Sequence, residues 1–175
     1  PDRKKERYLK DFKVTSYDAS VIISEPTTSA FFESIAVDRD GKIAANLLIN
    51  ELFGRLNKKN LPFEKNPITV DQMRELIELI QQNQISSKGT KDIFEIIWES
   101  GGSPLNLVDK LGLRQVQDTD TISEAVKSVF SENPEQVKKI ENNPKLVGWF
   151  VGQVMKKTEG KADPKLINQL IKKKL

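Results

Sequence analysis

Apolar residues recur three and four positions apart along nearly the whole chain, and this helical period constrains the fold more than any other feature. Clear examples are residues 43–56 (IAANLLINELFGRL) and 73–82 (MRELIELIQQ). No segment shows convincing strand-like alternation, and no Asn-Gly hairpin turn occurs. The sequence therefore predicts an all-α fold. The expected helices cover residues 2–12, 17–24, 27–37, 41–58, 70–84, 87–99, 104–111, 121–132, 134–142, 144–157 and 164–174.

Residues typical of helix ends punctuate this pattern. A capping side chain directly before a proline predicts a helix start, because its oxygen accepts from a free N–H of the first turn and proline has no N–H to leave unpaired. Such pairs begin at Ser103, Asn133, Asn143 and Asp163. Capping boxes are expected at Thr69, Thr121 and Asn133. Helix stops are expected at Gly101-Gly102, Gly112 and Gly160, where a left-handed residue can close the last turn.

Two stretches interrupt the helical pattern and predict domain boundaries. Residues 60–66 separate a first helical group from a second, and the polar, acidic residues 114–120 (RQVQDTD) separate the second group from the last. We expect a helical (linker) domain at residues 1–114, followed by a small tail domain at 115–175. A domain of that size is marginally stable alone and is expected to move on its tether. The charged, Met-less opening PDRKKERY suggests a piece of a longer protein.

The composition excludes most catalytic chemistry. The chain has no cysteine and no histidine, which removes thiol nucleophiles, histidine bases and nearly all zinc sites. The acidic pairs Asp38/Asp40 and Asp118/Asp120 are interpreted as caps and turn residues, so no metal site is expected. Residues 101–104 (GGSP) are interpreted as a helix stop followed by a helix start rather than a phosphate loop. No run of about 18 apolar residues predicts a membrane span.

Positive charge is concentrated at the end of the chain. The formal net charge is +3, yet residues 153–175 contain seven lysines against two acids and carry +5. Such a localised field favours a polyanionic partner. Three lysines lie at one tight turn and a fourth follows a turn later, so they can converge on neighbouring phosphates. These predicted phosphate ligands are Lys156, Lys157, Lys161 and Lys165.

Other residues near this turn have simpler interpretations. Lys172–Lys174 are expected to be a solvated helix end. Gly148 and Gly152 lie four residues apart on one helix, which suggests either a close backbone approach or, preferably, core packing in the terminal bundle. Trp149 and Trp98 are likewise expected in the core rather than as platforms that stack on bases.

The end of the chain resembles a known family. VGQVMKKTEGKADPKLINQLIKKKL (151–175) is similar to the C-terminal signature of the B subunit of aspartyl-tRNA(Asn)/glutamyl-tRNA(Gln) amidotransferase, VGQVMK-x-T-x-GKA-x-P-x-x-x-N. Further blocks resemble the same family in the same order. They are YDASVII at 17–23 with AFFES at 30–34, AANLLINEL at 44–52, ISSKGTKDIFEIIW at 85–98, Ser103-Pro104 through Gln115, and Asn133-Pro134 with Val137. The resemblance covers nearly the whole chain.

The resemblance implies the non-catalytic, C-terminal portion of that subunit: a helical domain plus a YqeY-like tail. The family's enzyme converts misacylated Glu-tRNA(Gln) or Asp-tRNA(Asn) to the amide form, with glutamine as the ammonia source and ATP and Mg²⁺ as cofactors. The implied partners are tRNA, gripped near the D-loop side of its elbow, and the amidotransferase A and C subunits. No catalytic residue and no cofactor is expected in this segment. The implied location is the bacterial cytoplasm, or the matrix of a mitochondrion or plastid.

Three departures from the family pattern affect detail. Leu48 stands where tryptophan is frequent, Gly89-Thr90 interrupts a helix that usually carries alanine, and Asp163 stands where asparagine is common. Asp163 retains cap function but adds a negative charge beside Lys161. The alternative function is a helical protein–protein interaction module, in which the exposed faces of residues 17–58 dock partner subunits and the lysines make no RNA contact.

Overall fold

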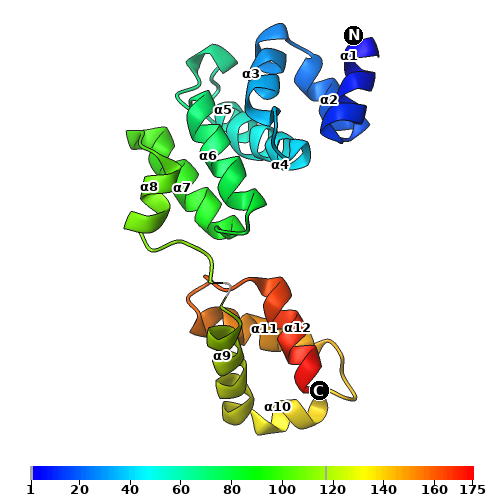
Figure 1. Cartoon of the computed structure of the whole chain (residues 1–175), viewed down its shortest axis with the longest axis vertical. Helices are drawn as coiled ribbons and strands as arrows, with labels where there is room; N and C mark the ends of the chain where they lie inside the picture. The colour runs from blue at the N-terminus through cyan, green and yellow to red at the C-terminus, as the bar shows by residue number, and fades with distance from the viewer. Residues whose placement is uncertain (1, 117) are drawn as a thin grey trace. The chain divides into compact units, whose positions relative to one another are not determined.

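The computed structural model describes residues 2–116 and 118–175, and these residues fold as helices, turns and two isolated β-bridges (Figure 1). The prediction of an all-α fold is confirmed. No helix among the described residues is long and apolar enough to cross a membrane. The chain divides into two compact units. Unit 1 comprises Pro1–Gln82 and Thr90–Leu111, and unit 2 comprises Asn83–Gly89 and Gly112–Leu175.

Helical periodicity located most elements to within a few residues. The first two predicted groups contain α1 (Asp2–Arg7), the π-helical η1 (Tyr8–Phe12), α2 (Ser16–Ile23), α3 (Pro26–Ala36), α4 (Gly41–Asn46), the π-helical η2 (Leu47–Phe53), α5 (Gly54–Lys58), the 3-10 turn η3 (Phe63–Lys65), α6 (Val70–Gln81), α7 (Ser87–Ser100) and α8 (Pro104–Lys110). The last group contains α9 (Thr119–Glu132), α10 (Pro134–Lys139), α11 (Leu146–Lys157) and α12 (Pro164–Lys174). The 3-10 turn lies in the first predicted boundary. Gln117, in the second, lies outside the described residues.

Several predicted caps are present. The capping box of Thr69 with Gln72 forms in both directions, and Ser103 and Asp163 accept from backbone N–H groups at the starts of α8 and α12. The glycines at the predicted helix stops have positive φ: 73° at Gly101, 63° at Gly112 and 74° at Gly160. Residues 101–104 are therefore a helix stop followed by a capped helix start.

Three predicted caps are wrong. The Asn133 side chain donates to the Val129 carbonyl oxygen (2.9 Å), so it closes α9 and does not cap α10. Asn143 caps nothing, because Pro144 and the next residue form a turn before α11 begins. Thr121 does not cap α9, because α9 begins at Thr119, two residues upstream of the expected start. Asp118 is its cap, and the Thr121 hydroxyl donates to the Asp118 carboxylate (2.9 Å). These hydrogen bonds from Thr121 and from the backbone lower the pKa of Asp118.

The interior of unit 1 combines aromatic rings with buried hydroxyl groups. Tyr8 and Phe32 are fully buried, and Phe12 packs edge-on against both rings, with centroid separations of 5.3 and 5.1 Å. The Tyr8 hydroxyl lies 2.7 Å from the hydroxyl of buried Ser29. Burial of a tyrosine is favourable when its hydroxyl finds such a partner. Among the glycines, Gly41 is the most crowded, because an added Cβ would lie 2.7 Å from the Phe12 Cβ.

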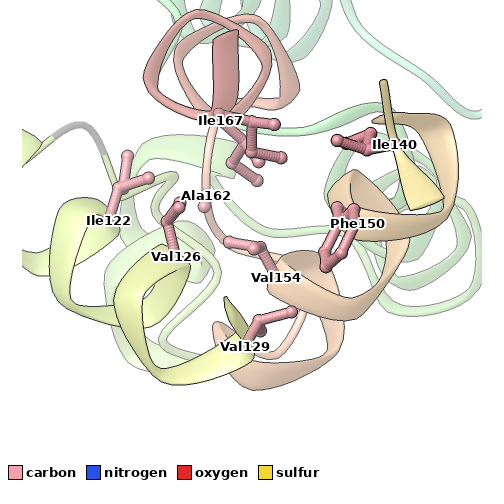
Figure 2. Close-up of a cluster of buried hydrophobic side chains, with 9 residues drawn as sticks. Ile122, Val126, Val129, Ile140, Phe150, Val154, Ala162 and Ile167 are labelled. Carbon is pink, nitrogen blue, oxygen red and sulfur yellow. The ribbon is translucent and has the colours of Figure 1, made fainter. Parts of the chain in front are cut away.

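The interior of unit 2 is smaller and almost entirely aliphatic (Figure 2). Helices α9, α11 and α12 pack on one another and supply most of it. The buried residues are Ile122, Val126, Val129, Ile140, Phe150, Val154, Ala162, Ile167 and Ile171. Each aliphatic side chain of this size contributes about 1.5–3 kcal/mol when it is fully removed from water. This core fixes the ends of α11 and α12, between which the predicted basic turn lies.

Candidate nucleic-acid interface

The basic turn begins where α11 ends in a Schellman motif. The Gly160 N–H donates to the Met155 carbonyl oxygen (2.7 Å), and the Glu159 N–H donates to the Lys156 carbonyl oxygen (3.1 Å). These two bonds satisfy carbonyl groups that the helix end would otherwise leave unpaired. The left-handed residue that closes the turn is Glu159 (φ 57°), with Gly160 (φ 74°) following it. The sequence predicted this role for the glycine alone.

The second half of the turn is held by a short bridge to the segment before α9. The Val116 N–H donates to the Lys161 carbonyl oxygen, and the Asp163 N–H donates back to the Val116 carbonyl oxygen (3.3 Å). Between them Ala162 is fully buried. Asp163 then starts α12 by accepting from the Lys165 N–H (2.9 Å). The turn between α11 and α12 is therefore a structured bend with defined backbone partners on both sides.

Two of the four predicted phosphate ligands already have acidic partners. The Lys157 ammonium donates to Glu132 on α9 (2.6 Å), and the Lys161 ammonium lies 3.2 Å from a Glu159 carboxylate oxygen. The hydrogen bond from Lys157 lowers the pKa of Glu132. Ion pairs this exposed contribute little to stability. Both lysines can therefore exchange a carboxylate for a phosphate at small cost.

The other two predicted ligands are free. Lys156 on the last turn of α11 and Lys165 on the first turn of α12 are exposed, and neither forms an ion pair with any residue that the structure describes. All four lysines belong to the end of α11, the bend and the start of α12. Their role as phosphate ligands stays a prediction. Asp163, the departure from the family pattern, serves as the α12 cap and is not the ion-pair partner of Lys161.

The end of α12 is exposed, as the sequence predicted, because Lys172, Lys173 and Lys174 are all exposed. The Lys174 ammonium also lies over the Phe130 ring, 5.9 Å from its centroid. A cation over an aromatic face gains roughly 0.5–1 kcal/mol at an exposed site. Lys174 is thus drawn back onto α9.

The prediction that Gly148, Gly152 and Trp149 lie in the core is wrong. Trp149 is 37% exposed, and an added Cβ at Gly148 or Gly152 would meet no described atom within 4 Å. The glycines therefore contribute neither core packing nor a close approach within unit 2. Only Trp98 follows the prediction, because it is partly buried and stacks on Phe94 with a centroid separation of 6.4 Å.

A helical wheel could have found this face. At 100° per residue, Lys145, Trp149, Gly152 and Lys156 lie together, opposite the buried Phe150 and Val154. The apolar character of the segment as a whole concealed the pattern, because glycine and tryptophan both count as apolar. The exposed face therefore consists of the two glycines and the indole ring between two lysines.

The acidic pairs have structural roles at helix starts. Asp40 caps α4 by accepting from the N–H groups of Lys42 and Ile43, and Asp118 caps α9. Asp38 occupies a left-handed turn position with φ 59°. No cluster of three or more potential metal ligands occurs in the part of the chain that the structure describes.

Comparison with known proteins gives one consistent family. The sequence model of the GatB domain family matches residues 30–175. The chain is 49% identical over all 175 residues to the B subunit of an aspartyl/glutamyl-tRNA(Asn/Gln) amidotransferase from Cereibacter sphaeroides. It is 48% identical to the protein of the same name from Sinorhizobium medicae and 47% to that from Methylorubrum populi. It spans 35–36% of the length of these relatives. Because the family model matches residues 30–175 and the identity to these relatives extends over the whole chain, the chain belongs to the GatB domain family.

Proposed function

We propose that this chain is the tRNA-binding, non-catalytic part of an amidotransferase B subunit, and that unit 2 makes the contact with tRNA. Family membership supports the assignment, because the relatives carry the name of an amidotransferase that acts on aspartyl- and glutamyl-tRNA. The complete enzyme would convert misacylated Glu-tRNA(Gln) or Asp-tRNA(Asn) to the amide form. It would use glutamine, ATP and Mg²⁺ and would assemble with A and C subunits in a bacterial cytoplasm or an organelle matrix.

The observation that carries the tRNA contact is the presence of free lysines on a backbone-anchored bend. Lys156 and Lys165 are exposed without an ion pair to any described residue, and the bend between them is fixed by the Schellman motif and the bridge to Val116. A rigid array of cations binds phosphates at a lower cost in conformational entropy than a flexible tail does. Lys157 and Lys161 would join it by releasing their carboxylates. Phosphate contacts of this kind supply affinity and register, while the shape of the tRNA elbow supplies selection.

A second candidate function is the docking of partner subunits on unit 1. Tyr17 on α2 is 74% exposed, and Val37 at the end of α3 is 46% exposed. Exposed tyrosines are frequent at the centres of protein interfaces. The two functions use different units and are compatible in one protein. Tyr17→Ala would weaken assembly with the A and C subunits and leave tRNA binding unchanged.

The tRNA contact is tested by a binding titration over a salt series. We expect the whole chain to bind a tRNA(Gln) or tRNA(Asn) transcript with an affinity that falls steeply as salt rises. Lys156→Ala with Lys165→Ala should weaken binding and lower the salt slope by about one for each lysine. Lys157→Ala should have a smaller effect, because that lysine must first leave Glu132.

The matched control is Lys58→Ala with Lys59→Ala, which removes two exposed positive charges from unit 1. This variant should keep both the affinity and the slope. If the Lys156/Lys165 and Lys58/Lys59 variants lose affinity equally, binding reflects net charge and not a site. If the unaltered chain does not bind the transcripts, the proposal for unit 2 fails and docking of partners becomes the leading function.

A further inference from the structure

The exposed face of α11 contains a large aromatic side chain that the core does not use. Trp149 is one of only two large hydrophobic side chains exposed among the described residues of unit 2, and the other is the terminal Leu175. The indole packs edge-on against Phe150 with a centroid separation of 5.0 Å, so it has a defined support. A supported but open indole is the kind of side chain on which a nucleobase can stack.

The surroundings of Trp149 leave it accessible. Gly152 and Gly148 lie to one side of Trp149, about 60° and 100° away around the helix, and a Cβ at either position would extend into open space. Glycine lowers helix stability by about 1 kcal/mol relative to alanine. Neither glycine is required by a positive φ or by an internal contact. The open backbone therefore serves contact with something outside this unit.

The charges around this face select the class of ligand. Lys145 and Lys156 lie at its two ends, about 16 Å apart along the helix at 1.5 Å per residue. Both are exposed and make no ion pair with described residues, and residues 145–157 contain no acid. A protein-docking face would present a contiguous apolar patch. This one presents a single aromatic ring between two cations, which complements a base between two phosphates.

We infer that Trp149 stacks on an unpaired RNA base, with Lys145 and Lys156 on the phosphates to either side and the sugar–phosphate backbone crossing the helix at Gly148 and Gly152. This inference rests on the proposed tRNA binding and deepens it. It adds Trp149 and Lys145 to the lysines of the bend. It also names the recognised feature as an unstacked nucleotide and not a regular duplex.

The test separates stacking from charge by salt dependence. Trp149→Ala should weaken binding of the tRNA transcripts by roughly five- to 150-fold at every salt concentration, because stacking of one base is worth about 1–3 kcal/mol. The salt slope should not change. Trp149→Phe should recover most of the affinity. Lys145→Ala should instead lower the slope by about one. In a Trp98→Phe background, Trp149 fluorescence should be quenched by the transcripts and not by a fully paired RNA duplex of equal length.

A second variant keeps the inference testable if Trp149→Ala unfolds unit 2. Gly152→Ala adds only a methyl group to open space, so it should raise the melting temperature while weakening RNA binding. The matched control is Gly54→Ala on α5, where an added Cβ approaches its nearest atom only at 4.0 Å. It should leave RNA binding unchanged.

The remaining outcomes show whether the stacking inference, the proposed tRNA binding or both are wrong. If Trp149→Ala, Trp149→Phe and Gly152→Ala bind as tightly as the unaltered chain while the Lys156/Lys165 variant does not, stacking is overturned and the proposed tRNA binding stands. If the unaltered chain binds no transcript, both proposals fall. If Trp149→Ala leaves RNA binding unchanged and weakens assembly with the A subunit, this face is a protein interface and the inference is overturned.

Discussion

The two units of this protein use their apolar and polar side chains in opposite ways. Unit 1 buries an aromatic cluster around Phe32 and satisfies the buried hydroxyl groups of Tyr8 and Ser29 inside the fold. Unit 2 buries aliphatic side chains and one phenylalanine, and none of its described polar residues is buried as a whole. Of its other two aromatic rings, Phe130 packs against the core and Trp149 is exposed. Unit 1 thus combines aromatic rings and hydroxyl groups inside its fold, whereas the interior of unit 2 is almost entirely aliphatic.

Glycine shows the same contrast. At Gly41 the packing inside unit 1 requires glycine, because a Cβ there would lie 2.8 Å from the Phe12 carbonyl carbon. At Gly148 and Gly152 nothing described lies within 4 Å of an added Cβ. The first glycine permits packing that already exists. The other two weaken their own helix without an internal gain, which is the pattern expected of residues selected for binding.

The largest effect should come from deleting the ring at the centre of unit 2. Phe150 is fully buried, so Phe150→Ala should lower the free energy of unfolding by about 3–5 kcal/mol. A unit this small cannot absorb that loss. Urea denaturation would be followed by fluorescence in two single-tryptophan variants, with Trp149 reporting on unit 2 and Trp98 on unit 1. Only the Trp149 transition should move. A shift of both transitions would show that the units unfold together.

Gly41→Ala should have the opposite effect to Phe150→Ala, because it should destabilise unit 1 and leave unit 2 unchanged. The added methyl group collides with the backbone of Phe12, which cannot rotate away like the tip of a flexible side chain. Overpacking of this kind costs about 1–3 kcal/mol, so the Trp98 transition should move to lower urea while the Trp149 transition stays. Gly54→Ala, an alanine at an uncrowded helical position, is the control. A neutral Gly41→Ala would contradict the close approach of α4 to η1.

Most of the fold was predictable because helices leave local signals. The period of apolar residues and the cap residues operate within a few positions, so 41–58 and 164–174 were located to the residue. The predictions failed where two local signals compete. At Asn133 the side chain can cap the following helix or close the preceding one, and the distant packing that decides is not visible in the sequence. The same holds for Thr121, whose hydroxyl serves the upstream cap Asp118.

The sequence predicted that the four lysines lie around one bend but not which residues they contact. Charge concentration alone pointed to Lys156, Lys157, Lys161 and Lys165. It could not show that Lys157 reaches Glu132, because that partner lies 25 residues away in the sequence. Nor could composition distinguish a buried tryptophan from an exposed one at Trp149. A helical wheel separates Trp149 from Phe150 and Val154, but only the packing of α11 against α9 and α12 shows which of the two faces is buried.

A smaller effect is expected at alkaline pH in unit 1. Burial raises the pKa of Tyr8, so the fold favours its neutral form. Its contribution is therefore complete below the unfolded pKa of about 10 and is lost as pH rises through the higher folded pKa. Tyr8→Phe should remove this dependence and cost about 1–2 kcal/mol at neutral pH, because Ser29 loses its partner. The Trp98 urea midpoint, measured from pH 8 to 11, checks both. Tyr17→Phe, at an exposed ring, should retain the dependence.

The smallest effect, and the one that links stability to binding, is expected at Glu132. The hydrogen bond from Lys157 lowers the pKa of Glu132, so the stabilisation of unit 2 by this pair is present above the unfolded pKa and is lost as pH falls through the folded one. Glu132→Gln should weaken this acid dependence of the Trp149 transition. At neutral pH the same change releases Lys157 to phosphate and should tighten tRNA binding roughly two- to five-fold, with a steeper salt slope.

The matched control is Glu135→Gln, which removes an equal charge from α10 without freeing a lysine. If it tightens binding as much as Glu132→Gln, repulsion by total charge explains the effect. If only Glu132→Gln tightens binding, the ion pair with Glu132 competes with phosphate for Lys157. RNA binding then breaks an ion pair that stabilises free unit 2.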